Sequence, residues 1–170
     1  PDGDLLDTDY VDRFDLFLVD YSGPRWGEQA EANLLAAIER GAGLVALSDS
    51  VAAFDDWEEY EELIGFRRGE YAYLDNFQEV VVRFDGPDHP IGAGQSGDLR
   101  RQDQLPVGLE YVEAKGRQVL ATMESASGSE SQPAMVVGER GKGRIFASPL
   151  GHVSNDRRET WVAQRDAASE

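Results

Sequence analysis

The two histidines are the side chains best suited to proton transfer near neutral pH, and both follow apolar segments. His152 comes shortly after the apolar residues 144–148, and His89 comes shortly after residues 79–85. Open α/β sheets bind ligands at the carboxyl ends of their strands, so the sequence predicts His152 and His89 as candidate catalytic residues. For His89, a turn histidine whose ring accepts a backbone hydrogen bond beside Pro90 is the competing interpretation.

A second group of reactive side chains is Ser48-Asp49-Ser50, directly after an apolar segment. Ser48 or Ser50 could act as a nucleophile, with His152 as base and Asp49 or Asp88 as the carboxylate that orients it. The segment lacks the Gly-x-Ser-x-Gly pattern of a nucleophile elbow, which weighs against this triad. Asp49 is therefore also a candidate catalytic residue as the partner of a histidine.

A divalent metal stays open as a cofactor. His89 and His152 could converge on an ion together with Asp20, Asp49 or Asp103, because imidazole and carboxylate are common ligands of such ions. No local spacing matches a known metal signature, so no residue is assigned as a metal ligand.

The elements that must position these groups follow a β-α-β pattern. Residues 15–20 are nearly all apolar between two acids, which is typical of a buried parallel strand, and residues 43–48 predict the next one. Between them, residues 26–40 predict a helix that ends at Gly41. Its apolar stripe contains Ala30, Leu34, Ala37 and Ile38, and Glu31 is expected off that stripe.

Asp20, Tyr21 and Ser22 follow the first predicted strand, and Ser48 follows the second. Because parallel strands end at the same edge of a sheet, these four side chains are predicted to bind the ligand.

The rest of the chain predicts one more helix and several strands. Residues 56–64 indicate a short helix that ends at Gly65. Strands are predicted at 76–85, 118–123, 133–138 and 144–148, the last two joined by a Gly-containing hairpin. The fold class is therefore α/β, a parallel sheet flanked by helices with an antiparallel extension, and residues 1–170 are expected to form a single domain.

The composition excludes several partners. The 33 acidic and 16 basic residues give a formal charge of −17, which repels nucleic acid and anionic membranes. There is no cysteine, so disulfides and thiolate chemistry are excluded. We expect a cytoplasmic protein, and the excess of acids is typical of proteins adapted to high salt.

The order of several motifs resembles the ThuA-like (trehalose utilisation) family, which has the class I glutamine amidotransferase-like, flavodoxin-like fold. The resemblance spans residues 14–152 and is carried by the following segments: Phe14-Asp15-Leu16-Phe17-Leu18-Val19-Asp20, Arg40-Gly41-Ala42-Gly43-Leu44-Val45-Ala46-Leu47, Phe54-Asp55-Asp56-Trp57, Asp88-His89-Pro90-Ile91, Gly141-Lys142-Gly143-Arg144-Ile145-Phe146 and Leu150-Gly151-His152. It implies a role in carbohydrate utilisation and a small sugar-like ligand. Glutaminase activity, which needs a cysteine nucleophile, is excluded.

Three departures from the family pattern concern the site. The family commonly has a histidine where this chain has Ser48, and another in the stretch that corresponds to residues 66–71, which contains none here. It has an Asp-Glu pair where this chain has Asp103-Gln104, so Asp103 is the retained carboxylate and is predicted to bind the ligand. Two functions therefore stay open: a domain that binds or transforms a sugar derivative, and a non-catalytic assembly domain.

The resemblance also implies two strands and a helix ahead of residues 14–20, but only thirteen residues precede that segment here. We expect amino-terminal strands of the family fold to be missing and the resulting sheet edge to promote homo-oligomer formation.

Overall fold

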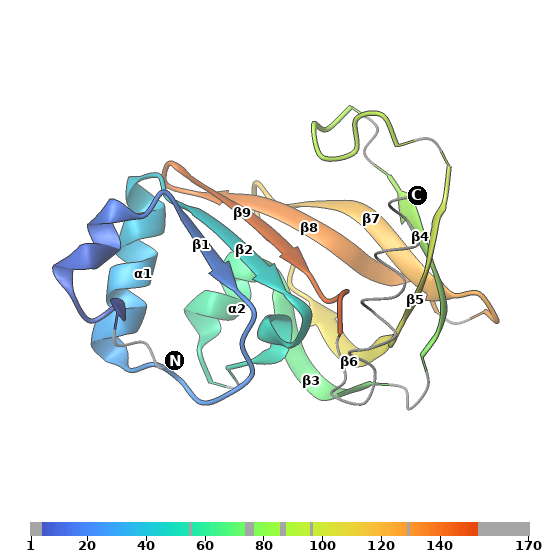
Figure 1. Ribbon diagram of the computed structural model, residues 1–170, viewed down its shortest axis with the longest axis horizontal. Coiled ribbons are helices and arrows are strands. Elements are labelled where there is room, and N and C mark those ends of the chain that lie inside the picture. Colours follow the sequence, from blue (N-terminus) through green and yellow to red (C-terminus); the bar gives the residue numbers. More distant parts are fainter. Residues whose placement is uncertain are drawn as a thin grey trace, which may run out of the picture.

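The computed structural model describes residues 5–54, 56–73, 77–85, 88–95, 97–128 and 130–152. Two short 3₁₀ helices, two α-helices and nine strands occur in these ranges (Figure 1). In chain order they are η2 (Asp9–Arg13), β1 (Leu16–Val19), α1 (Glu28–Arg40), β2 (Gly43–Leu47), η3 (Ser48–Ala52), α2 (Glu58–Ile64), β3 (Phe66–Tyr73), β4 (Gln78–Phe84), β5 (Leu99–Asp103), β6 (Pro106–Tyr111), β7 (Gln118–Ser125), β8 (Gln132–Arg140) and β9 (Gly143–Ser148).

Seven of the strands form one sheet in the order β1-β2-β9-β8-β7-β4-β5, and β3 pairs with β6 in a separate antiparallel ribbon. The pairs β1–β2 and β2–β9 are parallel, and the remaining pairs of the large sheet are antiparallel. Figure 1 shows β1 near α1 at one end of the sheet and β4 and β5 at the other. The predicted fold class, a parallel core with an antiparallel extension, is confirmed.

Helix α1 forms where the apolar stripe predicts it, although it begins at Glu28 instead of residue 26. Ala30, Leu34 and Ile38 are fully buried on its inner face. The helix ends at Gly41, whose N–H donates to the carbonyls of Ala37 and Ile38. Its positive φ of 133° turns the chain back, so that the N–H of Ala42 also donates to the carbonyl of Ala37 (3.0 Å). This glycine cap turns the chain directly into β2, and only Ala42 stands between the cap and the strand.

One face of the parallel strands is covered by the two α-helices. Leu34 and Ile38 of α1 and Tyr60 and Ile64 of α2 belong to the same buried cluster as every second residue of β1, β2, β9 and β8. These strand residues are Val19, Leu44, Ala46, Ile145, Ala147 and Val136. The core therefore lies between the helices and one face of the sheet, and the alternate strand residues face the other side.

The predicted second helix begins at Glu58 and ends at Gly65, which has the expected left-handed conformation (φ 83°). The predicted hairpin joins β8 to β9, and the predicted strand at 76–85 is β4; residue 76 lies outside the described residues. Strands β3, β5 and β6 were not predicted. Among the described helices, none is both long and apolar enough to cross a membrane.

Candidate functional site

The chain turns sharply where β2 ends, and Ser48 is at that turn. Its φ is +54°, and it is the one non-glycine residue with a positive φ in the described part of the chain. Two hydrogen bonds fix the turn: the Ser50 hydroxyl donates to the carbonyl of Leu47 (2.6 Å), and the Tyr60 hydroxyl donates to the carbonyl of Ser50 (3.1 Å). Burial also raises the pKa of Tyr60 above its ordinary value, so this phenol stays a donor.

His152 lies beside this turn because β9 is the parallel neighbour of β2. Leu47 pairs with Ser148 at the ends of the two strands, so the segments that follow them emerge at the same edge of the sheet. There, Nδ1 of His152 lies 3.7 Å from Oδ2 of Asp49. Both side chains are partly exposed, at 19% and 32%. The sequence-predicted residues Ser48, Asp49 and His152 are thus brought together, and the carboxylate is placed to orient the imidazole.

Asp103 holds the backbone next to His152. Its carboxylate is 1% exposed, and Oδ2 accepts a hydrogen bond from the N–H of Gly151 (3.0 Å). Oδ1 accepts from the N–H of Gln104 (2.9 Å), and Nε of Arg101 lies 3.2 Å from Oδ2. Asp103 therefore acts as a positioning residue for the turn that carries His152, and direct ligand binding by its carboxylate stays a prediction.

Asp20, Tyr21 and Ser22 follow β1 at the same edge. Asp20 is exposed, whereas Tyr21 is half-buried, stacks on Phe54 (5.7 Å between ring centroids) and donates its hydroxyl to the carbonyl of Pro24 (2.9 Å). Ser22 lines a hollow of about 510 Å³ formed by Ser22, Gly23, Pro24, Arg25, Ala53, Phe54, Asp56 and Arg68. An aromatic ring and two guanidinium groups therefore surround a space next to the carboxyl end of β1.

Arg25 of this hollow is held by a buried carboxylate. Glu31 of α1 is only 3% exposed, and both of its carboxylate oxygens accept hydrogen bonds from Arg25, one of them at 2.9 Å. This contact holds the pKa of Glu31 below its ordinary value. Glu31 was expected off the apolar stripe of α1, but it is buried with that stripe, because Arg25, six residues earlier, pairs with its carboxylate. Glu31 precedes Leu34 and Ile38 by three and seven residues, and this helical spacing is the sequence signal for its place on the buried face.

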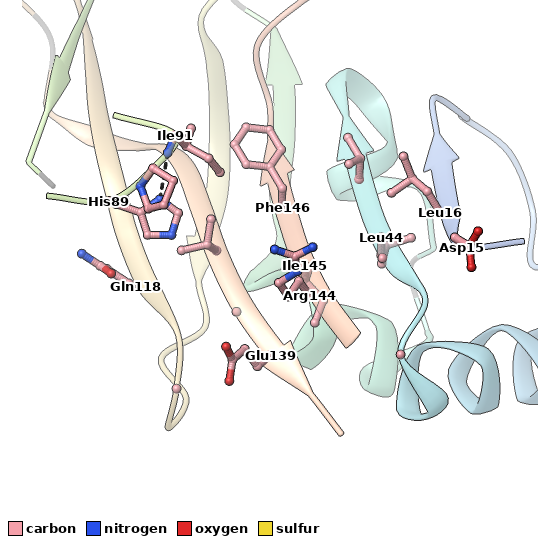
Figure 2. A pocket seen from close by; sticks show the side chains of 17 residues that line it. Asp15, Leu16, Leu44, His89, Ile91, Gln118, Glu139, Arg144, Ile145 and Phe146 are labelled. Atoms are coloured by element: carbon pink, nitrogen blue, oxygen red, sulfur yellow. Dashed lines mark hydrogen bonds between the residues drawn. The ribbon is translucent and has the colours of Figure 1, made fainter. Parts of the chain in front are cut away.

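His89 is in a different place. Its Nδ1 accepts the N–H of Ile91 at 3.2 Å, the turn hydrogen bond that the sequence suggested (dashed in Figure 2). It lines a cavity of about 650 Å³ on the face of the sheet opposite the α-helices. Figure 2 shows His89 and Ile91 on one side of this cavity, Phe146 in the middle and Leu16 and Asp15 on the far side. The residues that line the cavity do not include Ser48, Asp49, Asp103 or His152, so the structure does not bring the two histidines together.

Within the described ranges, no three His, Cys, Asp or Glu side chains are grouped so that they could hold a metal ion. Asp49 and His152 provide two adjacent donors. Their geometry suits an imidazole that exchanges a proton with a bound molecule while the carboxylate orients the ring.

The architecture defines a class: an α/β domain with a parallel core and an antiparallel extension, whose candidate functional groups lie at the carboxyl ends of parallel strands. A sequence profile of the ThuA family, described as trehalose utilisation, matches residues 2–165. The chain belongs to this ThuA family. No curated protein sequence matches the chain significantly.

Solved structures show the same fold. A ThuA-like protein from Parabacteroides merdae is 22% identical with a TM-score of 0.74, and the match covers 87% of this chain and 63% of that one. A β-galactosidase from Rahnella sp. R3 is 18% identical with a TM-score of 0.60, covering 96% of this chain and 24% of that one. A cytoplasmic protein from Salmonella typhimurium LT2 is 13% identical with a TM-score of 0.61, covering 94% and 73%. This chain thus spans less than two thirds of the Parabacteroides protein and about a quarter of the galactosidase.

Proposed function

We propose that this domain binds a small sugar derivative at the carboxyl ends of β1, β2 and β9, and that His152 transfers a proton to or from the bound sugar. The observation that carries the proposal is the contact between Nδ1 of His152 and Oδ2 of Asp49 at 3.7 Å. An imidazole can both accept and donate a proton, and a neighbouring carboxylate can hold it in one orientation. Asp103 contributes by holding the N–H of Gly151.

The surroundings suit a small polyhydroxylated molecule. Asp20, Ser22 and Ser48 follow neighbouring strands of the same sheet edge and offer hydrogen-bonding groups. The ring of Phe54 borders the adjacent hollow, and the guanidinium of Arg68 would favour a ligand that carries a carboxylate. Arg25 adds little to this preference, because it is already paired with Glu31. A neutral or weakly anionic sugar is compatible with a chain of charge −17, unlike a nucleic acid or an anionic membrane. Membership in the ThuA family supports a sugar as the ligand. We also propose a cytoplasmic location, as for the cytoplasmic protein from Salmonella typhimurium LT2 that has a similar fold.

The test is a thermal-shift screen with trehalose, glucose, gluconate and divalent cations. For the compound that raises the melting temperature most, His152→Ala should abolish the shift and change the melting temperature of the free protein little, because the imidazole is partly exposed. His89→Ala is the matched control and should keep the full shift, because His89 lines a different cavity. A shift that survives in His152→Ala but disappears in His89→Ala would overturn the assignment.

The second candidate is a non-catalytic assembly domain. It is favoured by the apolar side chains of β1, where Leu16 and Leu18 are 55% and 62% exposed. If none of the compounds shifts the melting temperature and the chain associates with itself, this function replaces the first.

A further inference from the structure

The hydroxyl of Ser48 differs from those of the other buried serines. In the described ranges the buried serines are Ser48, Ser50, Ser125 and Ser148. Ser50 and Ser148 donate to backbone carbonyls at 2.6 and 2.7 Å, and Ser125 donates to a side-chain amide oxygen at 2.6 Å. Ser48 is 7% exposed, and its hydroxyl takes part in no hydrogen bond within the described residues. Buried polar groups are normally paired, so this hydroxyl is a candidate for reaction with a ligand.

The backbone holds Ser48 at a sharp turn between a strand and a helical segment. β2 ends at Leu47, Ser48 has its φ of +54°, and η3 begins at the same residue. A serine on such a strand–turn–helix connection has the backbone arrangement of a nucleophile elbow. The usual glycines, two residues before and after the nucleophile, relieve crowding in this turn. Here these positions are Ala46 and Ser50, both 0% exposed, so two small buried side chains take the place of the glycines that the sequence lacks.

His152, which follows the neighbouring strand, is placed to accept the proton of this hydroxyl. β2 and β9 are parallel and end together, so Ser48 and the segment that carries His152 leave the sheet side by side. Nδ1 of His152 is buried and lies 3.7 Å from Oδ2 of Asp49. The second ring nitrogen, Nε2, is on the far side of the imidazole from Asp49, and this is the nitrogen that acts as base in a Ser-His-Asp arrangement.

We propose that Ser48 is a nucleophile that attacks carboxylic esters of small sugars, with His152 as its base. This reaction rests on the proposed function, because it uses the same sheet edge and the same histidine. The substrate is a sugar that carries either an O-acyl group or a lactone, since both contain the same ester bond.

The reaction has two steps that balance without any further reactant except water. In the first step, Oγ of Ser48 bonds to the ester carbonyl carbon and its proton passes to Nε2 of His152. The C–O bond to the alcohol then breaks, and the alcohol oxygen takes that proton. In the second step, water gives a proton to His152, its oxygen bonds to the acyl carbon, and Oγ of Ser48 leaves with the proton. The products are a carboxylic acid and an alcohol, which are parts of one molecule when the substrate is a lactone.

The first test is covalent labelling with a fluorophosphonate, which forms a phosphorus–oxygen bond to an activated serine and releases fluoride. Peptide mass spectrometry of the labelled wild type should find one adduct, on Ser48. Ser48→Gly should lose the adduct and still fold, because glycine accepts the positive φ. His152→Ala should slow the labelling about tenfold or more.

Ser127→Ala is the control for labelling. It changes an exposed serine on the loop after β7 and should label like the wild type. Thermal melts establish that all three variants fold. An unlabelled wild type, or an adduct on a serine other than Ser48, would overturn the proposal.

The second test measures hydrolysis of p-nitrophenyl acetate, an acetylated glucose and gluconolactone. For the substrates that react, kcat/KM should fall about a hundredfold or more in Ser48→Gly. Asp49→Asn should lower kcat and leave KM unchanged, since Asp49 orients His152 without contacting the ester. Hydrolysis of the acetylated sugar alone would identify an acyl ester as the substrate, and hydrolysis of gluconolactone alone would identify a lactone. Hydrolysis that Ser48→Gly leaves unchanged, or a wild type that hydrolyses none of the three, would overturn the proposal.

The two tests also distinguish this nucleophile from the sugar site on which it depends. If sugars stabilise the protein through His152 while Ser48 is neither labelled nor needed for hydrolysis, the nucleophile is wrong and sugar binding stands. If Ser48 is labelled but neither sugar ester is hydrolysed and no sugar stabilises the protein, the sugar site is wrong and sugar esters are excluded as the substrate.

Discussion

The positive φ of Ser48 can be tested by replacing it with glycine. A left-handed conformation costs an L-residue about 1–2 kcal/mol, and glycine adopts it without that cost. Against this, glycine gains more conformational freedom than serine in the unfolded chain, which lowers stability by about 0.4–1 kcal/mol. We therefore expect Ser48→Gly to raise the free energy of unfolding by about 0–1.5 kcal/mol. This gain is expected even though the replacement removes a buried side chain.

Ser50→Gly is the matched control in the same turn. Ser50 has no positive φ, and its hydroxyl donates to the carbonyl of Leu47 at 2.6 Å. Its replacement relieves no strain, loses a hydrogen bond worth about 1 kcal/mol and adds the same unfolded-state entropy. The control should therefore lose about 1.5–2 kcal/mol. The two variants should differ by about 1.5–3.5 kcal/mol, or roughly 3–14 °C in melting temperature for a chain of this size.

Urea unfolding followed by circular dichroism measures both free energies, and equal m-values would show that the unfolded states are comparable. If Ser48→Gly loses as much stability as Ser50→Gly, the backbone at Ser48 is not strained and the reasoning is refuted. Strain of this kind persists where function requires it, so Ser48→Gly should also weaken the response to the sugar found in the screen.

Two further predictions concern charge. Arg25 lowers the pKa of Glu31 below its ordinary value, so this pair stabilises the fold fully above about pH 4.5, and the stabilisation disappears as the pH falls through the lowered pKa. Glu31→Gln should therefore cost about 1–2 kcal/mol at pH 7 and much less once the pH is below the lowered pKa. A cost that does not depend on pH would contradict the assignment. The melting temperature of the wild type should rise from low to molar salt, because 33 acids and 16 bases leave a net repulsion that salt screens, and identical melts at both concentrations would exclude the high-salt interpretation.

The parts of the fold that the sequence predicts are those governed by local patterns. The stripe of α1 and its Gly41 cap, the short apolar β1 and β2, and the hairpin between β8 and β9 all depend on spacing within a few residues. β5 escaped prediction because Leu99–Asp103 is a charged edge strand with a single neighbour, which needs no apolar face. β3 and β6 pair with each other, and the bulge within β3 disturbs its alternation.

The site could be predicted only in part, for a related reason. Strand order brings His152 next to Asp49, and the rule that parallel strands end at a common edge anticipates this. The burial of Glu31 depends on Arg25 in a loop, and the anchoring of Gly151 depends on Asp103 at the far edge of the sheet. The positive φ of Ser48 is imposed by tertiary packing, since the sequence lacks the flanking glycines that usually accompany such a turn.

The central claim is that the ligand binds beside His152 and not beside His89. Because the chain has only these two histidines, proton NMR of the imidazole rings gives two sets of signals, which the variant His89→Gln assigns. Titration with trehalose, glucose or gluconate, whichever stabilises the protein most, should shift the signals of His152 and leave those of His89 unchanged. A shift confined to His89, or a saturable stabilisation that moves neither histidine, would contradict the account.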